Sequence, residues 1–178
     1  MQRREVIGLY MAASFASVLL AGSSFAQQKS LKEQLVGAWT IVSGSSKLPD
    51  GSAVWGTDPI GLIVFTSSGY YSSQLMRSDL PKYASNNRAK GTPEEYKAIG
   101  MGSVANFGTY SVDEANKTFT ISYNGSTFPN RKGTKETRPF VIEGDELRIR
   151  NPAPSTTALE PYCCSSVVVS ATAFPSAS

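Results

Sequence analysis

The sequence predicts an all-β domain of mainly antiparallel strands, arranged as a barrel or sandwich, with one short helix. Seven segments are rich in β-branched and aromatic residues, and clusters of Gly, Pro, Asn, Asp and Ser separate them. Most of these connections are short enough for hairpins, and only one segment carries a full set of helix-start signals. Strands in hairpin succession favour an antiparallel barrel or sandwich over a parallel sheet.

The seven expected strands span residues 36–43, 59–66, 70–76, 104–112, 118–123, 134–142 and 146–150. Ser67, Ser68 and Gly69 form a hairpin-type connection between the second and third of them. The clearest alternation lies in residues 118–123, where every second residue is apolar or aromatic. Side chains two apart in a strand share a face, so this set is expected to point inward.

The helix is expected to begin at Thr92 and to end near residue 99, before Gly100. Thr92 is a good N-cap, proline follows at the first helical position, and Glu95 completes a capping box. A shorter amphipathic turn is expected within residues 28–35. Residues 77–91 have no regular pattern, and loops of this length are often functional, so this segment is expected to be a lid.

Residues 1–26 have the features of a cleavable export signal. Arg3 and Arg4 precede an uncharged apolar run, and Ser24 and Ala26 offer small residues for signal peptidase. The paired arginines fit a twin-arginine signal, and an ordinary Sec signal is the alternative. A periplasmic or secreted bacterial protein is expected, without stable membrane insertion after cleavage, because the apolar run is short for a bilayer span.

The rest of the chain divides into an expected barrel domain, residues 27–150, and a tail, residues 151–178. The tail is dominated by Ser, Thr, Ala and Pro and contains a single charged residue, Glu160. Residues 165–171 offer an eighth strand, but they lack aromatic residues and clean alternation. A poorly ordered tail is therefore the other interpretation.

Composition excludes several classes of site. The 178 residues contain no histidine, which excludes Ser-His-Asp and Cys-His catalysis and histidine-ligated zinc or haem. The only two cysteines, Cys163 and Cys164, are adjacent, so a four-thiolate site is also excluded. Lys and Arg total 17 against 14 Asp and Glu, a balance that gives no case for nucleic-acid binding. No metal, cofactor or catalytic residue is assigned, and a monomer is expected.

Three strings in order carry a family resemblance. Residues 35–39 read Leu-Val-Gly-Ala-Trp, residues 69–77 read Gly-Tyr-Tyr-Ser-Ser-Gln-Leu-Met-Arg, and residues 107–113 read Phe-Gly-Thr-Tyr-Ser-Val-Asp. Together with residues 125–130 and 138–140, this series resembles the bacterial lipocalin-like domain over about residues 35–154. The resemblance implies an up-and-down β-barrel with an interior that holds a small molecule.

The resemblance also shows departures. Family members often carry a histidine where this chain has Ile121 or Ser122, and an aromatic residue where it has Arg131. The family's closing strand near the C-terminus is not recognisable here, so the last strand is expected to be missing or aberrant. A frameshift near residue 157 is one explanation.

Strand alternation, applied to the implied barrel, predicts cavity-lining residues. They are Tyr70, Ser72, Gln74, Met76, Phe107, Phe119, Ile121, Tyr123 and Arg138. For two strands the inward face is not decided by the sequence. In the alternative, the residues that face inward are Tyr71, Ser73 and Leu75 in one strand and Gly108, Tyr110 and Val112 in the other. Gly37 and Trp39 are expected to be structural, at the closed end of the barrel.

Two basic side chains need separate treatment. Arg138 is expected either to pair with a ligand anion or to lie against Trp39 in a cation–π contact. Arg131 belongs to a basic cluster with Lys132 and Lys135 that is interpreted as a solvated turn.

The leading functional hypothesis is an exported, noncatalytic protein that binds or carries a small hydrophobic molecule inside the barrel. The alternatives are an isomerase or hydrolase that uses the barrel cavity, or a protein-binding module. Fold cannot decide between them. A buried carboxylate that converges with Tyr and Arg would favour the enzyme, and acids confined to turns would count against it.

Overall fold

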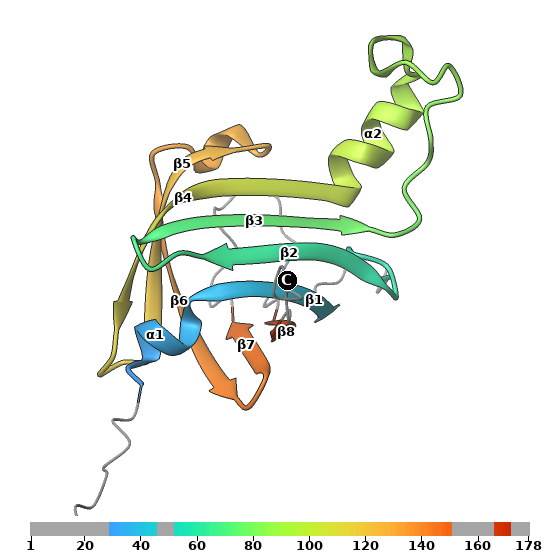
Figure 1. Cartoon of the computed structure of the whole chain (residues 1–178). Helices are drawn as coiled ribbons and strands as arrows, with labels where there is room; N and C mark the ends of the chain where they lie inside the picture. The colour runs from blue at the N-terminus through green and yellow to red at the C-terminus, as the bar shows by residue number, and fades with distance from the viewer. Residues whose placement is uncertain (1–28, 46–51, 151–165, 172–178) are drawn as a thin grey trace, which may run out of the picture.

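The computed structural model describes residues 29–45, 52–150 and 166–171. Eight strands pair in sequence order, each antiparallel to the next, and the last pairs with the first to close a barrel (Figure 1). The strands are β1 (Gly37–Gly44), β2 (Pro59–Phe65), β3 (Tyr70–Arg77), β4 (Ser103–Asp113), β5 (Thr118–Ser126), β6 (Lys135–Glu143), β7 (Glu146–Arg150) and β8 (Ser166–Ala171). The helical elements are α1 (Leu31–Leu35), η1 (Arg88–Lys90), α2 (Pro93–Gly102) and η2 (Pro129–Arg131). The predicted antiparallel barrel is confirmed.

Strand β8 corrects the expectation of a missing or aberrant last strand. It pairs with β1 through Ile41 and Val169, and with β7 through Leu147 and Val169, so it bonds to both neighbours. Val169 is fully buried. Three consecutive β-branched valines suit a strand, but without polar alternation they gave a weak signal in the sequence. The two cysteines and the remainder of the expected tail lie outside the described residues.

The hairpin between β2 and β3 sets which side chains enter the barrel. Gly69 has a φ of +89°, and its N–H donates to the Thr66 carbonyl at 3.0 Å. The tight turn places Phe65 opposite Tyr71 and Ile63 opposite Ser73. Residues directly opposite in an antiparallel pair share a face, so all four face the interior.

The α1 end of the barrel is filled by aromatic and aliphatic side chains. The Phe65 ring lies 5.0 Å from the Tyr110 ring and 5.3 Å from the Phe119 ring, centroid to centroid. Trp39 is buried nearby, and its Nε1–H donates to the Leu35 carbonyl at 2.8 Å, which ties β1 to α1. This end is a packed core.

Helix α2 begins as the sequence predicts. The Glu95 N–H donates to Thr92 Oγ1 at 3.3 Å, and the Thr92 N–H donates to Glu95 Oε2 at 2.8 Å, which completes the capping box. The helix runs on to Gly102, past Gly100, where the sequence placed its end. The preceding loop is tied to it, since the Ala84 N–H donates to Glu95 Oε1 at 2.8 Å. The helix projects from the ends of β3 and β4 (Figure 1).

Within the described residues, none of the helices has the length and apolar character required to cross a bilayer.

Candidate ligand-binding site

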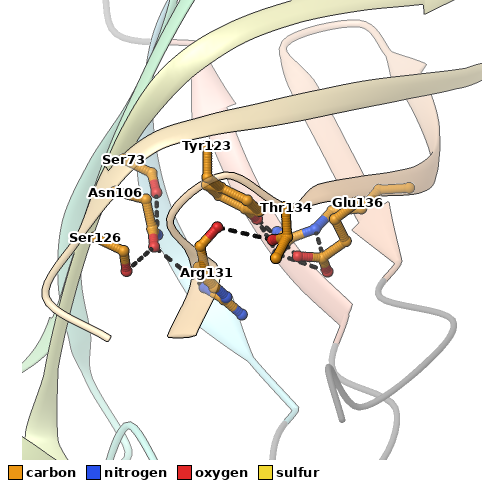
Figure 2. Close-up of polar contacts among 8 residues, drawn as sticks. Ser73, Asn106, Tyr123, Ser126, Arg131, Thr134 and Glu136 are labelled. Atoms are coloured by element: carbon orange, nitrogen blue, oxygen red, sulfur yellow. Dashed lines mark hydrogen bonds and ion pairs between the residues drawn. The ribbon is translucent and has the colours of Figure 1, made fainter. Parts of the chain in front are cut away.

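Polar side chains gather inside the barrel at the end away from α1. Glu114, in the turn between β4 and β5, accepts hydrogen bonds from the Leu31 and Lys32 N–H groups, so this turn lies at the α1 end. Strand β5 runs away from that turn, and β6 begins at the far end. The polar cluster there consists of Ser73, Asn106, Tyr123, Ser126, Arg131, Thr134, Glu136 and Arg138 (Figure 2).

Tyr123, Glu136 and Arg138 form a closed triangle. The Tyr123 hydroxyl donates to Glu136 Oε2 at 2.7 Å, and Arg138 Nε donates to Glu136 Oε1 at 3.0 Å. Arg138 Nη2 also donates to the Tyr123 hydroxyl oxygen at 3.2 Å. The Glu136 and Arg138 side chains are only 14% and 13% exposed. The sequence places these two residues two apart on β6, so alternation directs both inward.

A second chain of hydrogen bonds crosses from β3 to η2. Asn106 Nδ2 donates to the Ser73 hydroxyl at 3.1 Å, and the Ser126 hydroxyl donates to Asn106 Oδ1 at 2.8 Å. Arg131 Nη1 donates to the same amide oxygen at 3.3 Å. The Arg131 guanidinium carbon also lies 5.4 Å from the centroid of the Tyr123 ring, which joins the two parts of the cluster.

The loop between β5 and β6 holds Arg131 in place. Gly133 has a φ of +79°, and its N–H donates to the Tyr123 carbonyl at 2.8 Å. Thr134 donates from its hydroxyl to the Arg131 carbonyl at 2.8 Å. These bonds fold the loop back onto β5, and Figure 2 shows Arg131 beside Asn106 and Tyr123.

Burial and charge shift the titration of the triangle. Burial alone would raise the pKa of Glu136, but the Arg138 charge and the hydrogen bonds from Arg138 and Tyr123 lower it below its usual range. Burial raises the pKa of the Tyr123 hydroxyl well above its ordinary value. Burial would lower the pKa of Arg138, but nearby Tyr71 and Glu136 outweigh it and raise that pKa. At neutral pH the triangle therefore holds a carboxylate, a guanidinium and a neutral phenol.

The cluster offers hydroxyl, amide and guanidinium groups, together with one carboxylate. Within the described ranges, no group of three or more Asp, Glu or Cys side chains is placed to hold a metal ion. Such a donor set suits a polar or anionic group of an organic molecule rather than a metal.

The structure brings together two of the predicted site residues, Tyr123 and Arg138. Phe119 and Ile121 are also buried in the barrel, on the α1 side of Tyr123 along β5. Arg138 bonds to Glu136, where the sequence offered a ligand anion or Trp39 as its partner. Gly37 begins β1, beside Trp39 at the α1 end.

The face predicted for β3 is corrected. Tyr70 is 60% exposed and Ser72, Gln74 and Met76 are partly exposed, whereas Tyr71, Ser73 and Leu75 are buried. Both faces of this strand mix an aromatic residue with polar and apolar ones, so the pattern of the strand alone does not show which face is buried. The pairing of Phe65 with Tyr71 decides the face.

Phe107 is corrected in the same way. It is 56% exposed and lies outside the barrel, where its ring covers Gly125. The pairing of β4 with β5 shifts register between Phe107 and Gly108, and Asn106 and Tyr110 face inward. The open alternative, with Gly108 and Tyr110 inside, is therefore the observed one for those two residues.

Most residues of the polar cluster carry no clear signal in the sequence. The one available signal is the spacing of Glu136, Arg138 and Phe140, which lie two residues apart in a strand and so share a face. The sequence predicts that Arg131 lies in a solvated basic turn, and the structure instead directs its side chain to Asn106 and Tyr123. Only the fold of the loop back onto β5 shows this.

The described part of the chain forms hollows on the outside of the barrel, and two of them are well defined. One, of about 220 Å³, lies between α2 and the end of β3 and is lined by Arg77, Leu80 and Met101 among others. The other, of about 340 Å³, lies beside α1 and is lined by Glu33, Trp39 and Asp145 among others. Neither is lined by a residue of the polar cluster.

The family model described as "Lipocalin-like domain" matches residues 36–168, which span seven of the eight strands and the beginning of β8. Among curated proteins, none matches the chain.

Proposed function

Since the chain belongs to the lipocalin-like domain family, we propose that it binds or carries a small, largely hydrophobic molecule at the polar-cluster end of its barrel. In this proposal the protein is exported, acts as a monomer and performs no catalysis. Its partner is the small molecule alone, with no nucleic acid involved.

The polar cluster carries this proposal. Small-molecule sites are mostly apolar and contain a few well-placed polar groups that fix the orientation of the ligand. Here Tyr71, Ile121 and Tyr123 supply buried apolar and aromatic surface, and the cluster supplies the polar groups from four strands and one loop. Barrels of about eight strands have an interior of the size that holds one small ligand.

One observation favours the enzyme as a second candidate. Glu136 is a buried carboxylate that converges with Tyr123 and Arg138, which is the arrangement an isomerase or hydrolase without histidine would need. Both Glu136 oxygens, however, already accept hydrogen bonds, and the pKa of Glu136 is lowered. A general base works best with a pKa near the working pH, so binding without catalysis is the better-supported function.

Titration with N-phenylnaphthylamine, a neutral apolar probe that fluoresces when it leaves water, tests binding directly. We expect Ser126→Trp, which places a large ring beside Asn106, to weaken probe binding. Thr109→Trp adds the same ring to the outer surface of β4 and is expected to leave binding unchanged. Equal binding by both variants, or none by the unmodified protein, would contradict the proposed site.

Native mass spectrometry of protein purified from its source would then identify a bound molecule by its mass.

Export is tested separately, by the processing of the N-terminus. We expect the protein in the cell envelope to begin at Gln27. Replacing Arg3 and Arg4 by lysine is expected to block export by a twin-arginine route but to leave Sec export intact. Unprocessed protein in the cytoplasmic fraction would contradict export by either route.

A further inference from the structure

We infer that the ligand carries one negative charge, as a carboxylate or sulfonate, and that Arg131 selects this group. The inference rests on the proposed function and names the class of molecule bound. It comes from the charge balance of the polar cluster and from the hydrogen bonds that Arg131 leaves unmade.

The cluster contains two guanidinium groups and one carboxylate. Glu136 neutralises Arg138, with 2.9 Å between Oε1 and Nη2. In the part of the chain that the structure describes, no carboxylate lies within 4.0 Å of the Arg131 guanidinium. Its contacts there are neutral, the Asn106 amide oxygen and the Tyr123 ring. Among the described residues, the polar cluster therefore holds two guanidinium charges against one carboxylate, which pairs directly with Arg138 and acts on Arg131 only through its charge.

The Arg131 guanidinium also has an edge open to a ligand. Its Nε is buried and has no hydrogen-bond partner among the described residues, and its Nη2 donates to none of them. Among the described residues, Nη1 is the one guanidinium nitrogen of Arg131 that donates a hydrogen bond, and its 3.3 Å distance is long for an N–H···O bond. A buried polar group without a partner is rare and costly, so an acceptor is expected there.

Nε and Nη2 lie side by side on one edge of a guanidinium, and the two oxygens of a carboxylate or sulfonate accept from that edge together. A neutral carbonyl or hydroxyl would satisfy one N–H and leave the charge unbalanced. A cation would be repelled, and a dianion would exceed the single spare charge. A monoanionic head group with an apolar body fits both the edge and the balance.

Two probes with the same aromatic body test this choice. N-phenylnaphthylamine is neutral, and anilinonaphthalene sulfonate is the same amine with one sulfonate added. We expect the purified protein to bind the sulfonate probe more tightly than the neutral one. Arg131→Gln is expected to reduce affinity for the sulfonate about tenfold or more, because a hydrogen bond to a charged group is lost.

Lys132→Gln is the matched control, since it removes the same charge from the exposed neighbouring position. It is expected to leave both affinities unchanged. Arg131→Lys keeps the charge but loses the paired donors, and an intermediate affinity for the sulfonate is expected. A cooperative urea unfolding transition of Arg131→Gln, like that of the unmodified protein, shows that the variant is folded.

The outcomes separate this inference from the function it rests on. Equal affinity of the unmodified protein for the two probes, or the same loss in Lys132→Gln as in Arg131→Gln, overturns the anionic ligand and leaves small-molecule binding intact. Failure of the unmodified protein to bind either probe overturns both.

Discussion

The two ends of the barrel are filled by different chemistry. At the α1 end, Phe65 and Phe119 are 1% and 0% exposed and lie in a group of ring contacts between 5.0 and 5.5 Å. At the other end, Asn106 and Tyr123 are also buried, but each is held by hydrogen bonds, and charged side chains surround them. The side chains are buried to a similar extent at the two ends, but only those at the polar end can form hydrogen bonds and ion pairs with a ligand.

This difference predicts that the two ends contribute differently to stability and to ligand recognition. A buried aromatic ring removes about 150–250 Å² from water, and each Å² is worth about 25 cal/mol. A typical hydrogen bond contributes about 1 kcal/mol net to the free energy of unfolding, because its two groups lose their hydrogen bonds to water. The α1 end is therefore expected to supply most of the stability, and the polar cluster to supply recognition.

The largest expected effect lies at the α1 end. Phe65→Ala removes the ring that contacts Tyr71, Tyr110 and Phe119, and it leaves a cavity in the packed core. We expect a loss of about 3–5 kcal/mol in the free energy of unfolding, measured by urea denaturation. The same change at the exposed Phe107 is the control, and a loss of about 1 kcal/mol or less is expected there. Equal losses at the two positions would contradict the assignment of β4.

The next effect lies in the polar cluster. Glu136→Gln removes the partner of Arg138 and leaves a buried charge unpaired, so we expect a loss of about 2–3 kcal/mol by the same method. The double variant Glu136→Leu with Arg138→Met replaces the pair by apolar side chains. It is expected to recover most of that loss, since buried ion pairs contribute little net stability. A double variant less stable than Glu136→Gln would show that the pair itself stabilises the fold.

Acid should act on the two ends differently. The pKa of Glu136 is lowered in the folded protein from an ordinary value of 4.5, so its contribution to stability is fully present above about pH 4.5. That contribution is lost as the pH falls through the lowered value. We expect Glu136→Gln to flatten the decline in stability of the unmodified protein below pH 4.5, measured by urea denaturation across pH. Phe65→Ala should lower the whole curve without changing its slope, and an unchanged slope in Glu136→Gln would argue against this assignment.

Much of the fold could be predicted from the sequence, because its signals are local. Turn residues such as Gly69 and the capping box of Thr92 and Glu95 depend on neighbours along the chain. The last strand could be offered from the sequence only as one of two interpretations. Residues around Val169 show no strand alternation, and the pairing with β1 and β7 is what holds them as a strand.

The candidate site was less predictable, because it depends on which face of each strand turns inward. For Tyr123 the alternation was clear, and the side chain lies in the interior. The sequence pattern of β3 does not show whether Tyr70 or Tyr71 faces inward. The pairing of Tyr71 with the buried Phe65 places Tyr71 inside the barrel. The inward position of Arg131 could not be predicted, because a loop that folds back onto β5 has no periodic pattern in the sequence.

The smallest expected effect tests whether hydrogen bonds at the polar end are mainly structural. Ser73→Ala removes the acceptor of Asn106 Nδ2, and we expect a loss of about 1 kcal/mol in the free energy of unfolding. Because Asn106 Oδ1 also accepts from Arg131, the freed amide is expected to reorient and to lower affinity for the sulfonate probe. Fluorescence titration beside urea denaturation separates the two consequences. A stability loss with unchanged affinity would mean that Arg131 is positioned by its own loop and by Tyr123 rather than by the chain of hydrogen bonds that starts on β3.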